Sequence, residues 1–345
     1  MSIVERLWYG DDASARVARA ALAPASWLYG VAVSARAWRF DHSDGAIHSA
    51  ALPVLSLGNV TVGGTGKTPV AAWAAATLQS RGARPAIVMR GYGDDEPIVH
   101  ARLNPTVPVI VDADRVRGAA RAMQAGADCV ILDDGFQHRR IARMSDWVLV
   151  SAERWRDDLR LLPAGPLREP VGALARADIV LVTRKSAALS AADRIGQRLQ
   201  EQQPALHVAV CHLAFDALVT PRTQERRPVS WLSGRHVVAA AAVGDAAAFF
   251  AQLEATGAHV DARAYRDHHA FTPADVAALV AVADRCDGLV CTLKDAVKLG
   301  PLWPANAAPL WYVSQIAVIE RGVAELDRAL DAVLAARQAV TSTAG

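Results

Sequence analysis

Short apolar runs alternate with longer amphipathic stretches along the chain from residue 53 onward. The short runs have the length of strands, and the longer stretches have the length of helices. Strands that are apolar throughout and separated by helices are typical of a parallel sheet with helices on both faces. The first part of the pattern predicts strands at Val54–Leu57, Ala86–Met89, Val107–Val111, Cys129–Leu132, Trp147–Val150 and Ile179–Val182, and helices at Lys67–Gln79 and around Arg117–Ala125.

A polar, arginine-rich segment (PRTQERRP) interrupts this pattern at residues 221–228. We interpret it as a linker between an α/β domain at 41–220 and a smaller α/β domain at 229–345. The second domain is predicted to contain strands at Val237–Ala242, Val260–Ala264 and Leu289–Thr292, and helices at Ala246–Thr256, Pro273–Asp284 and Val323–Arg337.

Residues 1–40 precede both domains and have a different character. The stretch from Ala20 to Ala35 has no charge, arginines flank it on both sides, and Trp27 and Trp38 lie in or beside it. Its sixteen residues are short of the roughly 20 needed to cross a bilayer, and Pro24 and Gly30 are expected to interrupt it. These features favour a helix that lies in a membrane interface. The alternative is an ordinary amphipathic helix packed on the domain.

The charge balance, the mean hydropathy and the cysteine spacing limit the partners and the compartment that we expect for this protein. The 345 residues include 37 Lys and Arg against 35 Asp and Glu, and the net charge of +2 lies entirely in residues 1–40. Such a balance makes nucleic acid a poor candidate partner. The mean hydropathy is +0.15, which an alanine-rich α/β protein with one interfacial segment explains. The four cysteines form no C-x-x-C pair, so a reducing compartment fits better than a disulfide framework.

A glycine-rich turn between the first predicted strand and helix is the strongest chemical signal. The sequence GNVTVGGTGKT at 58–68 has the strand–loop–helix context of a P-loop, whose backbone amides surround phosphate oxygens. Lys67 is expected to reach the β- and γ-phosphates of ATP, and the Thr68 hydroxyl is expected to bind Mg²⁺. Thr61 replaces the first glycine of the usual pattern. The predicted nucleotide-binding residues are Thr61, Val62, Gly63, Gly64, Thr65, Gly66, Lys67 and Thr68.

A second signal follows the strand that ends at Leu132. Asp133 and Asp134 come directly after it, where a carboxylate emerges at the edge of the sheet that carries the P-loop. We predict that Asp133 belongs to the Mg²⁺ site, and that Asp134 lies close enough to tune this site or to contact the hydrated metal. The alternative is a surface Asp-Asp-Gly turn.

Together these residues resemble the tetraacyldisaccharide 4'-kinase family, which phosphorylates the lipid A precursor. The resemblance rests on motifs that occur in order along nearly the whole chain: GNVTVGGTGKTP (58–69), RGYG (90–93), DEP (95–97), DDGFQHRR (133–140), LLPAGPLREP (161–170), DHHAF (267–271) and TLKDAVKL (292–299).

The resemblance implies a P-loop NTPase-like, mainly parallel α/β sheet with a smaller C-terminal α/β domain and a membrane-associated N-terminal helix. It implies transfer of the γ-phosphate of ATP, with Mg²⁺, to the 4'-hydroxyl of a lipid A disaccharide precursor. It also implies a peripheral or monotopic position on the cytoplasmic face of a Gram-negative inner membrane, with no obligate protein partner.

The resemblance further implies an Asp–His dyad as the base that takes the hydroxyl proton. The dyad falls on Asp95 and His268, which lie in different predicted domains, so closure of the domains would assemble it. The adjacent Asp94 is an alternative to Asp95. From the residues alone, both parts have plainer interpretations: the acidic residues as a solvated turn, and His268 as part of a polar loop.

Arg168 resembles the family's phosphate-contacting arginine, and the alternative is a salt bridge with Glu169. Weaker candidates for the acceptor site are Arg90 and Arg115, together with Gln137 and His138. For His138, contact with the acceptor and contact with a metal-bound water both stay open.

Two other functions remain open at this point. A soluble P-loop ligase or small-molecule kinase would share the P-loop and the aspartates but would have no use for residues 13–40. A nucleotide-dependent switch would hold or hydrolyse nucleotide without any lipid acceptor.

Overall fold

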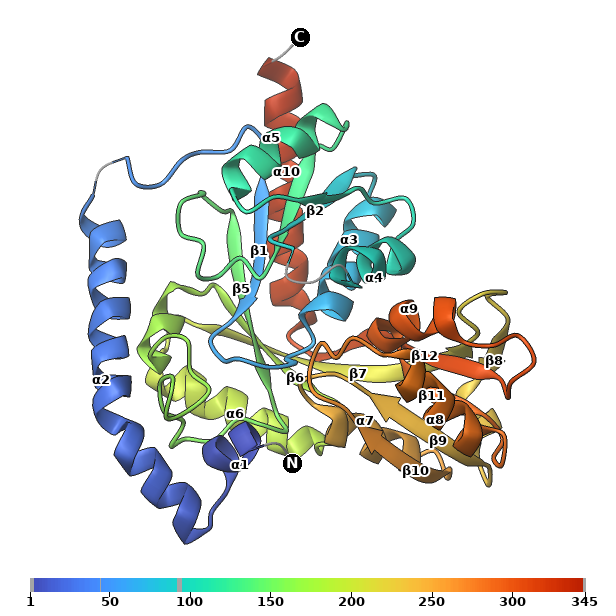
Figure 1. Cartoon of the computed structure of the whole chain (residues 1–345). Coiled ribbons are helices and arrows are strands. Elements are labelled where there is room, and N and C mark those ends of the chain that lie inside the picture. Colours follow the sequence, from blue (N-terminus) through green and yellow to red (C-terminus); the bar gives the residue numbers. More distant parts are fainter. Residues whose placement is uncertain (1–2, 44, 92–94, 344–345) are drawn as a thin grey trace.

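The computed structural model describes residues 3–43, 45–91 and 95–343 (Figure 1). The strands are β1 (Val54–Asn59), β2 (Pro85–Met89), β3 (Val109–Val111), β4 (Cys129–Asp133), β5 (Ser145–Ser151), β6 (Ile179–Arg184), β7 (His207–Val219), β8 (Arg226–Pro228), β9 (His236–Ala241), β10 (His259–Ala264), β11 (Leu289–Thr292) and β12 (Leu310–Arg321). The helices are α1 (Ile3–Tyr9), α2 (Ala13–His42), α3 (Lys67–Ser80), α4 (Asp95–Leu103), α5 (Arg115–Gln124), α6 (Leu189–Gln202), α7 (Ala246–Glu254), α8 (Pro273–Ala283), α9 (Leu293–Leu302) and α10 (Val323–Thr343), with short 3₁₀ helices at Val171–Arg176 and Val229–Leu232.

Within the described residues, all the strands belong to one sheet with the order β10-β9-β11-β12-β7-β6-β5-β1-β4-β2-β3, and β8 pairs with β7. Pairing is parallel on both sides of the centre, from β3 to β7 and from β12 to β10. The long strands β7 and β12 are antiparallel to each other. The predicted α/β fold with a mainly parallel sheet is therefore confirmed.

Helices cover both faces of the sheet in its N-terminal half. On one face, α3 and α10 pack on alternate residues of β1, β4, β5 and β6, including Leu55 and Trp147. On the other face, α5 packs on β2 and β4, and α6 packs on β5 and β6. Apart from the edge strand β3, these strands bury both of their faces, which explains why they are mainly apolar.

The C-terminal half extends the same sheet. There α7 covers one face of β9 and β11, while α8 and α9 cover the other. The segment predicted as a linker, 221–228, forms a turn that leads into β8. The sheet runs unbroken past it through β7 and β12 (Figure 1). The division into two domains remains a prediction, whereas the two halves share one sheet.

The N-terminal segment forms α1 and α2, and α2 runs along one side of the molecule (Figure 1). The expectation that Pro24 and Gly30 interrupt it is wrong, because α2 is one continuous helix of 30 residues. Pro24 and Ala20 are exposed, so water can hydrate the carbonyl that has lost its N–H partner. Gly30 is buried against Leu161, where a Cβ would lie 2.9 Å from Leu161 Cδ1. No helix in the described ranges is long and apolar enough to cross a membrane.

Candidate active site

The loop between β1 and α3 has the geometry of a phosphate cradle. Gly63 and Gly66 have φ angles of +116° and +82°, which glycine adopts without strain. A Cβ on Gly66 would also lie 2.3 Å from Leu213 Cδ1. Gly66 precedes α3 and no side chain caps this helix, so its first amides stay open toward the loop. The N-terminus of α3 is therefore available to an anion.

The structure explains why threonine is tolerated at position 61. Thr61 forms a bridge with Leu167, the Val62 amide donates to Pro166 O at 2.8 Å, and the Arg168 amide donates to Val60 O at 2.7 Å. This pairing holds the start of the loop extended, so no glycine is needed there. It also brings the LLPAGPLREP motif beside the P-loop. Residues 62–68 line a cavity, and Thr61 lies behind them in the bridge.

Lys67 and Arg168 converge on Asp134. Lys67 Nζ lies 3.3 Å from Asp134 Oδ1, and Arg168 Nη1 donates to both carboxylate oxygens at 3.0 Å. Burial acts to raise the pKa of Asp134, but these two cations outweigh it and lower the pKa below its usual value. The alternative pairing of Arg168 with Glu169 is wrong, because Glu169 accepts from Arg176 at 2.7 Å.

Asp133 is the last residue of β4 and is only 5% exposed, which excludes a surface turn at this position. Its Oδ2 accepts from His100 Nε2 at 2.7 Å, while its Oδ1 is buried without a hydrogen-bond partner in the described structure. Burial acts to raise the pKa of Asp133, but His100 and Lys67 lower it below its usual value.

These groups fit magnesium, which needs one or two carboxylates and fills its other positions with hydroxyl, water and phosphate oxygens. Asp133, Asp134 and Thr68 line the cavity and offer such carboxylate and hydroxyl oxygens. The described residues contain no cluster of three His, Cys, Asp or Glu side chains that would form an all-protein metal site.

Asp95 and His268 meet across the two halves of the chain. Asp95 begins α4, is 7% exposed, and lies with its Oδ1 3.6 Å from His268 Nδ1. Its Oδ2 lies 3.3 Å from Lys298 Nζ. His268 has a φ of +57°, a strained conformation for a residue other than glycine and one that often marks functional sites. The interpretation of Asp95 as part of a solvated turn is therefore wrong, and Asp94 lies outside the described residues.

Three nearby basic side chains lower the pKa of Asp95. Burial alone would raise the pKa of Asp95, but Lys298, Lys294 and His268 outweigh it, so its pKa is lower than usual. Sequence reasoning missed Lys298, although the motif TLKDAVKL contains it. A signal for it exists in the composition, because the chain has only four lysines (67, 185, 294 and 298) among its 37 basic residues. All four lie in or beside this site.

A cavity of about 490 Å³ lies over the P-loop between the two halves. Besides residues 62–69, its wall includes Asp133, Asp134, Lys185, His268 and Lys294, together with apolar side chains such as Leu213 and Phe249. We call it the nucleotide cavity. Its volume falls within the range of small-molecule sites.

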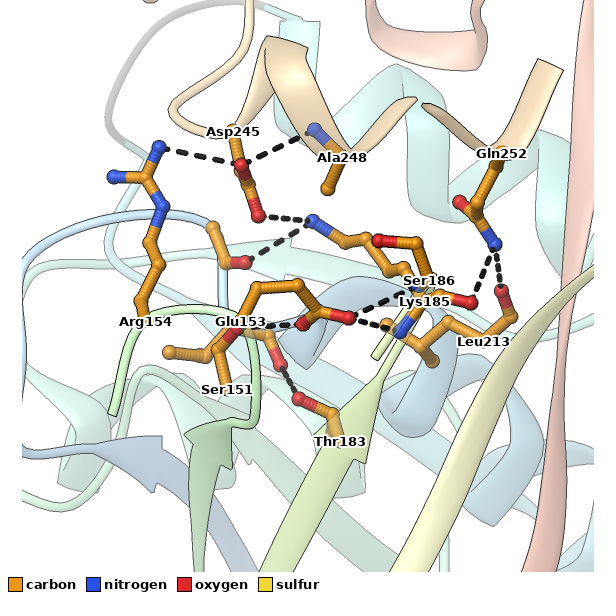
Figure 2. A network of polar contacts seen from close by, with 12 residues as sticks. Ser151, Glu153, Arg154, Thr183, Lys185, Ser186, Leu213, Asp245, Ala248 and Gln252 are labelled. Carbon is orange, nitrogen blue, oxygen red and sulfur yellow. Dashed lines mark hydrogen bonds and ion pairs between the residues drawn. The ribbon is translucent and has the colours of Figure 1, made fainter. Parts of the chain in front are cut away.

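A polar network supports the P-loop from the side of β6 (Figure 2). Thr183 Oγ1 donates to Thr65 O at 2.8 Å, and Lys185 Nζ lies 3.2 Å from Asp245 Oδ2 and 3.5 Å from Gly64 O. Asp245, which caps α7, also accepts from Arg154. Sequence reasoning missed this network, which joins the C-terminal half to the P-loop.

A second cavity, of about 540 Å³, lies between α2 and the P-loop half. It shares Val62, Arg90, Asp134 and Arg168 with the nucleotide cavity, so the two cavities meet there. Its other polar lining residues are Tyr29, Arg36, Arg115, Gln137, His138, Arg139 and Glu169. We call it the arginine cavity, and it contains all four residues predicted for the acceptor site.

Two buried nitrogen atoms of arginine-cavity residues have no hydrogen-bond partner in the described structure. Arg115 is 2% exposed, and neither its Nε nor Nε2 of His138 has a hydrogen-bond partner in the described structure. Burial and the charge of Arg115 lower the pKa of His138 to about 4, so its ring is neutral at pH 7. Such groups suit a polar ligand that supplies the missing partners.

Helix α2 is tied to the wall between the cavities. Tyr29 Oη donates to Arg168 O at 2.9 Å, and Arg36 Nη2 donates to Gln137 O at 3.1 Å. Gln137 in turn donates from its Nε2 to Asn59 O at 2.8 Å, and its Oε1 accepts from Arg168 at 3.3 Å. The N-terminal helix and the P-loop are therefore linked through two residues.

Comparisons with known proteins agree with this architecture. The family model described as "Tetraacyldisaccharide-1-P 4'-kinase" matches residues 18–95 and 93–335. A tetraacyldisaccharide 4'-kinase of Anaeromyxobacter sp. (strain K) is 36% identical over 97% of each chain, and one of Halorhodospira halophila is 38% identical over 90% of this chain and 91% of its own. The crystal structure of LpxK from Aquifex aeolicus in complex with ATP superimposes with a TM-score of 0.70 at 27% identity, covering 91% of this chain and 99% of that one.

Proposed function

This chain belongs to the tetraacyldisaccharide-1-P 4'-kinase family, and from that premise we propose how its two cavities divide the reaction. It is an ATP-dependent lipid kinase that phosphorylates the 4'-position of a lipid A disaccharide precursor. In the proposal, ATP occupies the nucleotide cavity and the sugar headgroup occupies the arginine cavity. The single observation that carries this assignment is their shared wall at Arg90, Asp134 and Arg168.

Phosphoryl transfer needs positioning and charge neutralisation more than covalent chemistry. The acceptor oxygen forms a bond to the γ-phosphorus, and the bond between that phosphorus and the ADP oxygen breaks. The P-loop amides and Lys67 hold the phosphates, while Arg168 neutralises charge on the group in transfer. Thr68, Asp133 and Asp134 would hold Mg²⁺, which supplies further neutralisation of the phosphate oxygens.

The proton of the acceptor hydroxyl goes to Asp95 in this proposal. The lowered pKa of Asp95 means that it is an ionised acceptor at neutral pH. His268 lies 3.6 Å from it and comes from the other half of the chain. It would orient the carboxylate and complete the site only when the two halves are correctly placed.

The arginine cavity suits a phosphorylated sugar. Arg90 and Arg115 present guanidinium groups, which bind phosphate in a planar, two-point geometry. His138 is neutral because its pKa is about 4, so it serves as a hydrogen-bonding group to the sugar. Gln137 borders the same space and also contacts Arg168.

The outer side of α2 supports an interfacial position. Trp27, Leu28 and Trp38 are 68%, 62% and 63% exposed, although the opposite side of the helix packs on the chain. Exposed aromatic and aliphatic side chains on one side of a helix are suited to the headgroup region of a bilayer. We propose that α2 places the arginine cavity at the cytoplasmic face of a Gram-negative inner membrane, where the acyl chains of the substrate can remain in the lipid.

A transfer assay tests the division of roles. Protein, γ-labelled ATP and the disaccharide 1-phosphate lipid are combined in mixed micelles, and label on the lipid is measured for wild type, Asp94→Ala and Asp95→Ala. We expect label on the lipid with wild type and with Asp94→Ala, and a severe loss with Asp95→Ala. If Asp94→Ala is the inactive variant, the base is misassigned. Label released only as inorganic phosphate would instead favour a nucleotide switch.

A further inference from the structure

His100 is a buried histidine with no role in the scheme above. It lies in the middle of α4, is 0% exposed, and has its Nε2 2.7 Å from Asp133 Oδ2. An ionised carboxylate only accepts hydrogen bonds, so the imidazole donates through its Nε2–H. Its other nitrogen, Nδ1, is buried without a partner in the part of the chain that the structure describes. A ring that carries its proton on Nε2 leaves only a lone pair unpaired at Nδ1, which is less costly than an unpaired buried N–H.

This hydrogen bond determines which oxygen of Asp133 is available. His100 occupies Oδ2, while Oδ1 is the buried atom without a partner among the described residues. Asp133 lines the nucleotide cavity together with the P-loop residues Lys67 and Thr68. With one oxygen held by the imidazole, the carboxylate cannot rotate freely, and Oδ1 keeps a single orientation.

The same hydrogen bond ties two parts of the site together. Helix α4 begins at Asp95, five residues before His100, and Glu96 pairs with Lys294 of α9 at 2.8 Å. Near its other end, Arg102 Nη1 donates to Pro221 O at 3.2 Å. These contacts attach α4 to the C-terminal half, whereas the His100 contact attaches it to β4. His100 therefore connects the helix of Asp95 to the strand of Asp133.

We propose that His100 is a positioning residue that holds the Asp133 carboxylate with Oδ1 directed at the bound divalent cation. The inference rests on the proposed function, because it takes Asp133 as a magnesium-binding residue. Groups that hydrogen-bond to metal-binding side chains typically change metal affinity by 10- to 100-fold when they are removed. A histidine that only filled space in the core would leave metal affinity unchanged.

The test compares His100→Gln with His100→Leu. Glutamine places an N–H near the position of Nε2, whereas leucine fills similar space without a donor. The readout is the dissociation constant of Mn²⁺, measured by electron paramagnetic resonance on the full chain with a non-hydrolysable ATP analogue. We expect His100→Leu to weaken Mn²⁺ binding by about 10- to 100-fold and His100→Gln to restore most of it. In activity assays, the Mg²⁺ concentration for half-maximal rate should rise for His100→Leu only.

Control variants distinguish loss of the His100–Asp133 contact from loss of the fold and from failure of the proposed function. Arg102→Gln removes another anchor of α4 that does not touch Asp133, and it should leave Mn²⁺ affinity near that of wild type. If His100→Leu does not fold, as judged by its thermal melt, then His100→Asn replaces it, because its shorter side chain cannot reach Asp133.

Wild-type Mn²⁺ affinity in the leucine or asparagine variant would overturn the inference, and so would equal losses in the glutamine and leucine variants. Asp133→Asn is the reference for the site itself. If Asp133→Asn binds Mn²⁺ as tightly as wild type, it is the metal assignment of the proposed function that fails.

Discussion

The nucleotide cavity and the arginine cavity meet at Asp134 and Arg168, yet they use different groups to face their ligands. The wall of the nucleotide cavity contains the P-loop and three lysines, Lys67, Lys185 and Lys294, in addition to the shared Arg90 and Arg168. The arginine cavity has no lysine among its described lining residues, and its positive charge comes from arginine alone.

This difference has a chemical reason. A lysine ammonium is a compact charge that can follow a phosphate during transfer, whereas an arginine guanidinium is a rigid fork that fixes the orientation of its ligand. In the proposed scheme, Lys67, Lys185 and Lys294 line the cavity assigned to phosphoryl transfer, and Lys298 pairs with Asp95 beside it. The arginine cavity is assigned to orienting a large acceptor. Substitutions in the two cavities should therefore change different kinetic constants.

The largest effect is expected on the nucleotide side. Lys67→Ala removes the cation beside Asp134 and the P-loop, so kcat/KM for transfer should fall by roughly 10³-fold or more. Binding of the lipid, measured by displacement of a fluorescent lipid, should change little. Arg156→Ala is the matched control, because Arg156 pairs with Asp11 on the surface outside both cavities. Near-normal turnover by Lys67→Ala would contradict the P-loop assignment.

On the acceptor side we expect a smaller and different loss. Arg115→Leu removes a buried guanidinium that lines the arginine cavity, so KM for the lipid should rise about tenfold while KM for ATP stays the same. Arg117→Leu is the control on the same helix, since Arg117 is exposed and pairs with Asp112. A rise in KM for ATP but not for the lipid would reverse the assignment of the cavities.

The pH dependence of kcat tests whether Asp95 is the base and whether the neighbouring lysines set its pKa. Lys298 is the cation that contributes most to the lowered pKa of Asp95, so Lys298→Met should raise that pKa. A base with a higher pKa becomes protonated at a higher pH, so the acid limb of kcat should move upward. Lys294→Met should move it in the same direction by less, because Lys294 pairs with Glu96. A downward movement in Lys298→Met would argue against Asp95 as the base.

The smallest effect on the chemistry is expected from α2. The double variant Trp27→Ser/Trp38→Ser should bind anionic vesicles several-fold more weakly in flotation, because two aromatic rings no longer enter the interface. Its kcat in mixed micelles should stay within a factor of about two. The pair Met123→Ser/Leu302→Ser removes exposed apolar side chains from α5 and α9 instead, and should float as wild type does. Equal flotation of all three proteins would refute the membrane role of α2.

The sequence predicted the parallel part of the fold because its strands are buried on both faces and are apolar throughout. It failed at β7 and β12, which contain polar residues such as His212, Asp216, Gln315 and Glu320 and pair with each other across about a hundred residues. Because polar and apolar residues are mixed in these two strands, the sequence did not predict that one sheet continues through both halves. The prediction that Pro24 interrupts the N-terminal helix was wrong for a different reason. An exposed helix tolerates the hydrogen bond that proline cannot make.

Much of the candidate site was predictable from motifs at the ends of strands. Lys67, Asp133 and Asp134 follow from strand–loop–helix order, since parallel strands present their carboxyl ends at one edge. The contacts of Lys298 with Asp95 and of His100 with Asp133 depend on how α4 and α9 pack, which the local sequence pattern does not specify. The arginine cavity likewise exists only because α2, far away in the sequence, packs beside the P-loop half.

The central claim is that Asp95 and His268, from the two halves of the chain, act as one unit. Its most direct test is kcat for Asp95→Ala, His268→Ala and the double variant at saturating ATP and lipid. Each single variant should lose roughly 10²- to 10⁴-fold, and the double variant should be little slower than the worse of the two. Losses that multiply in the double variant would show two independent contributions and contradict the account.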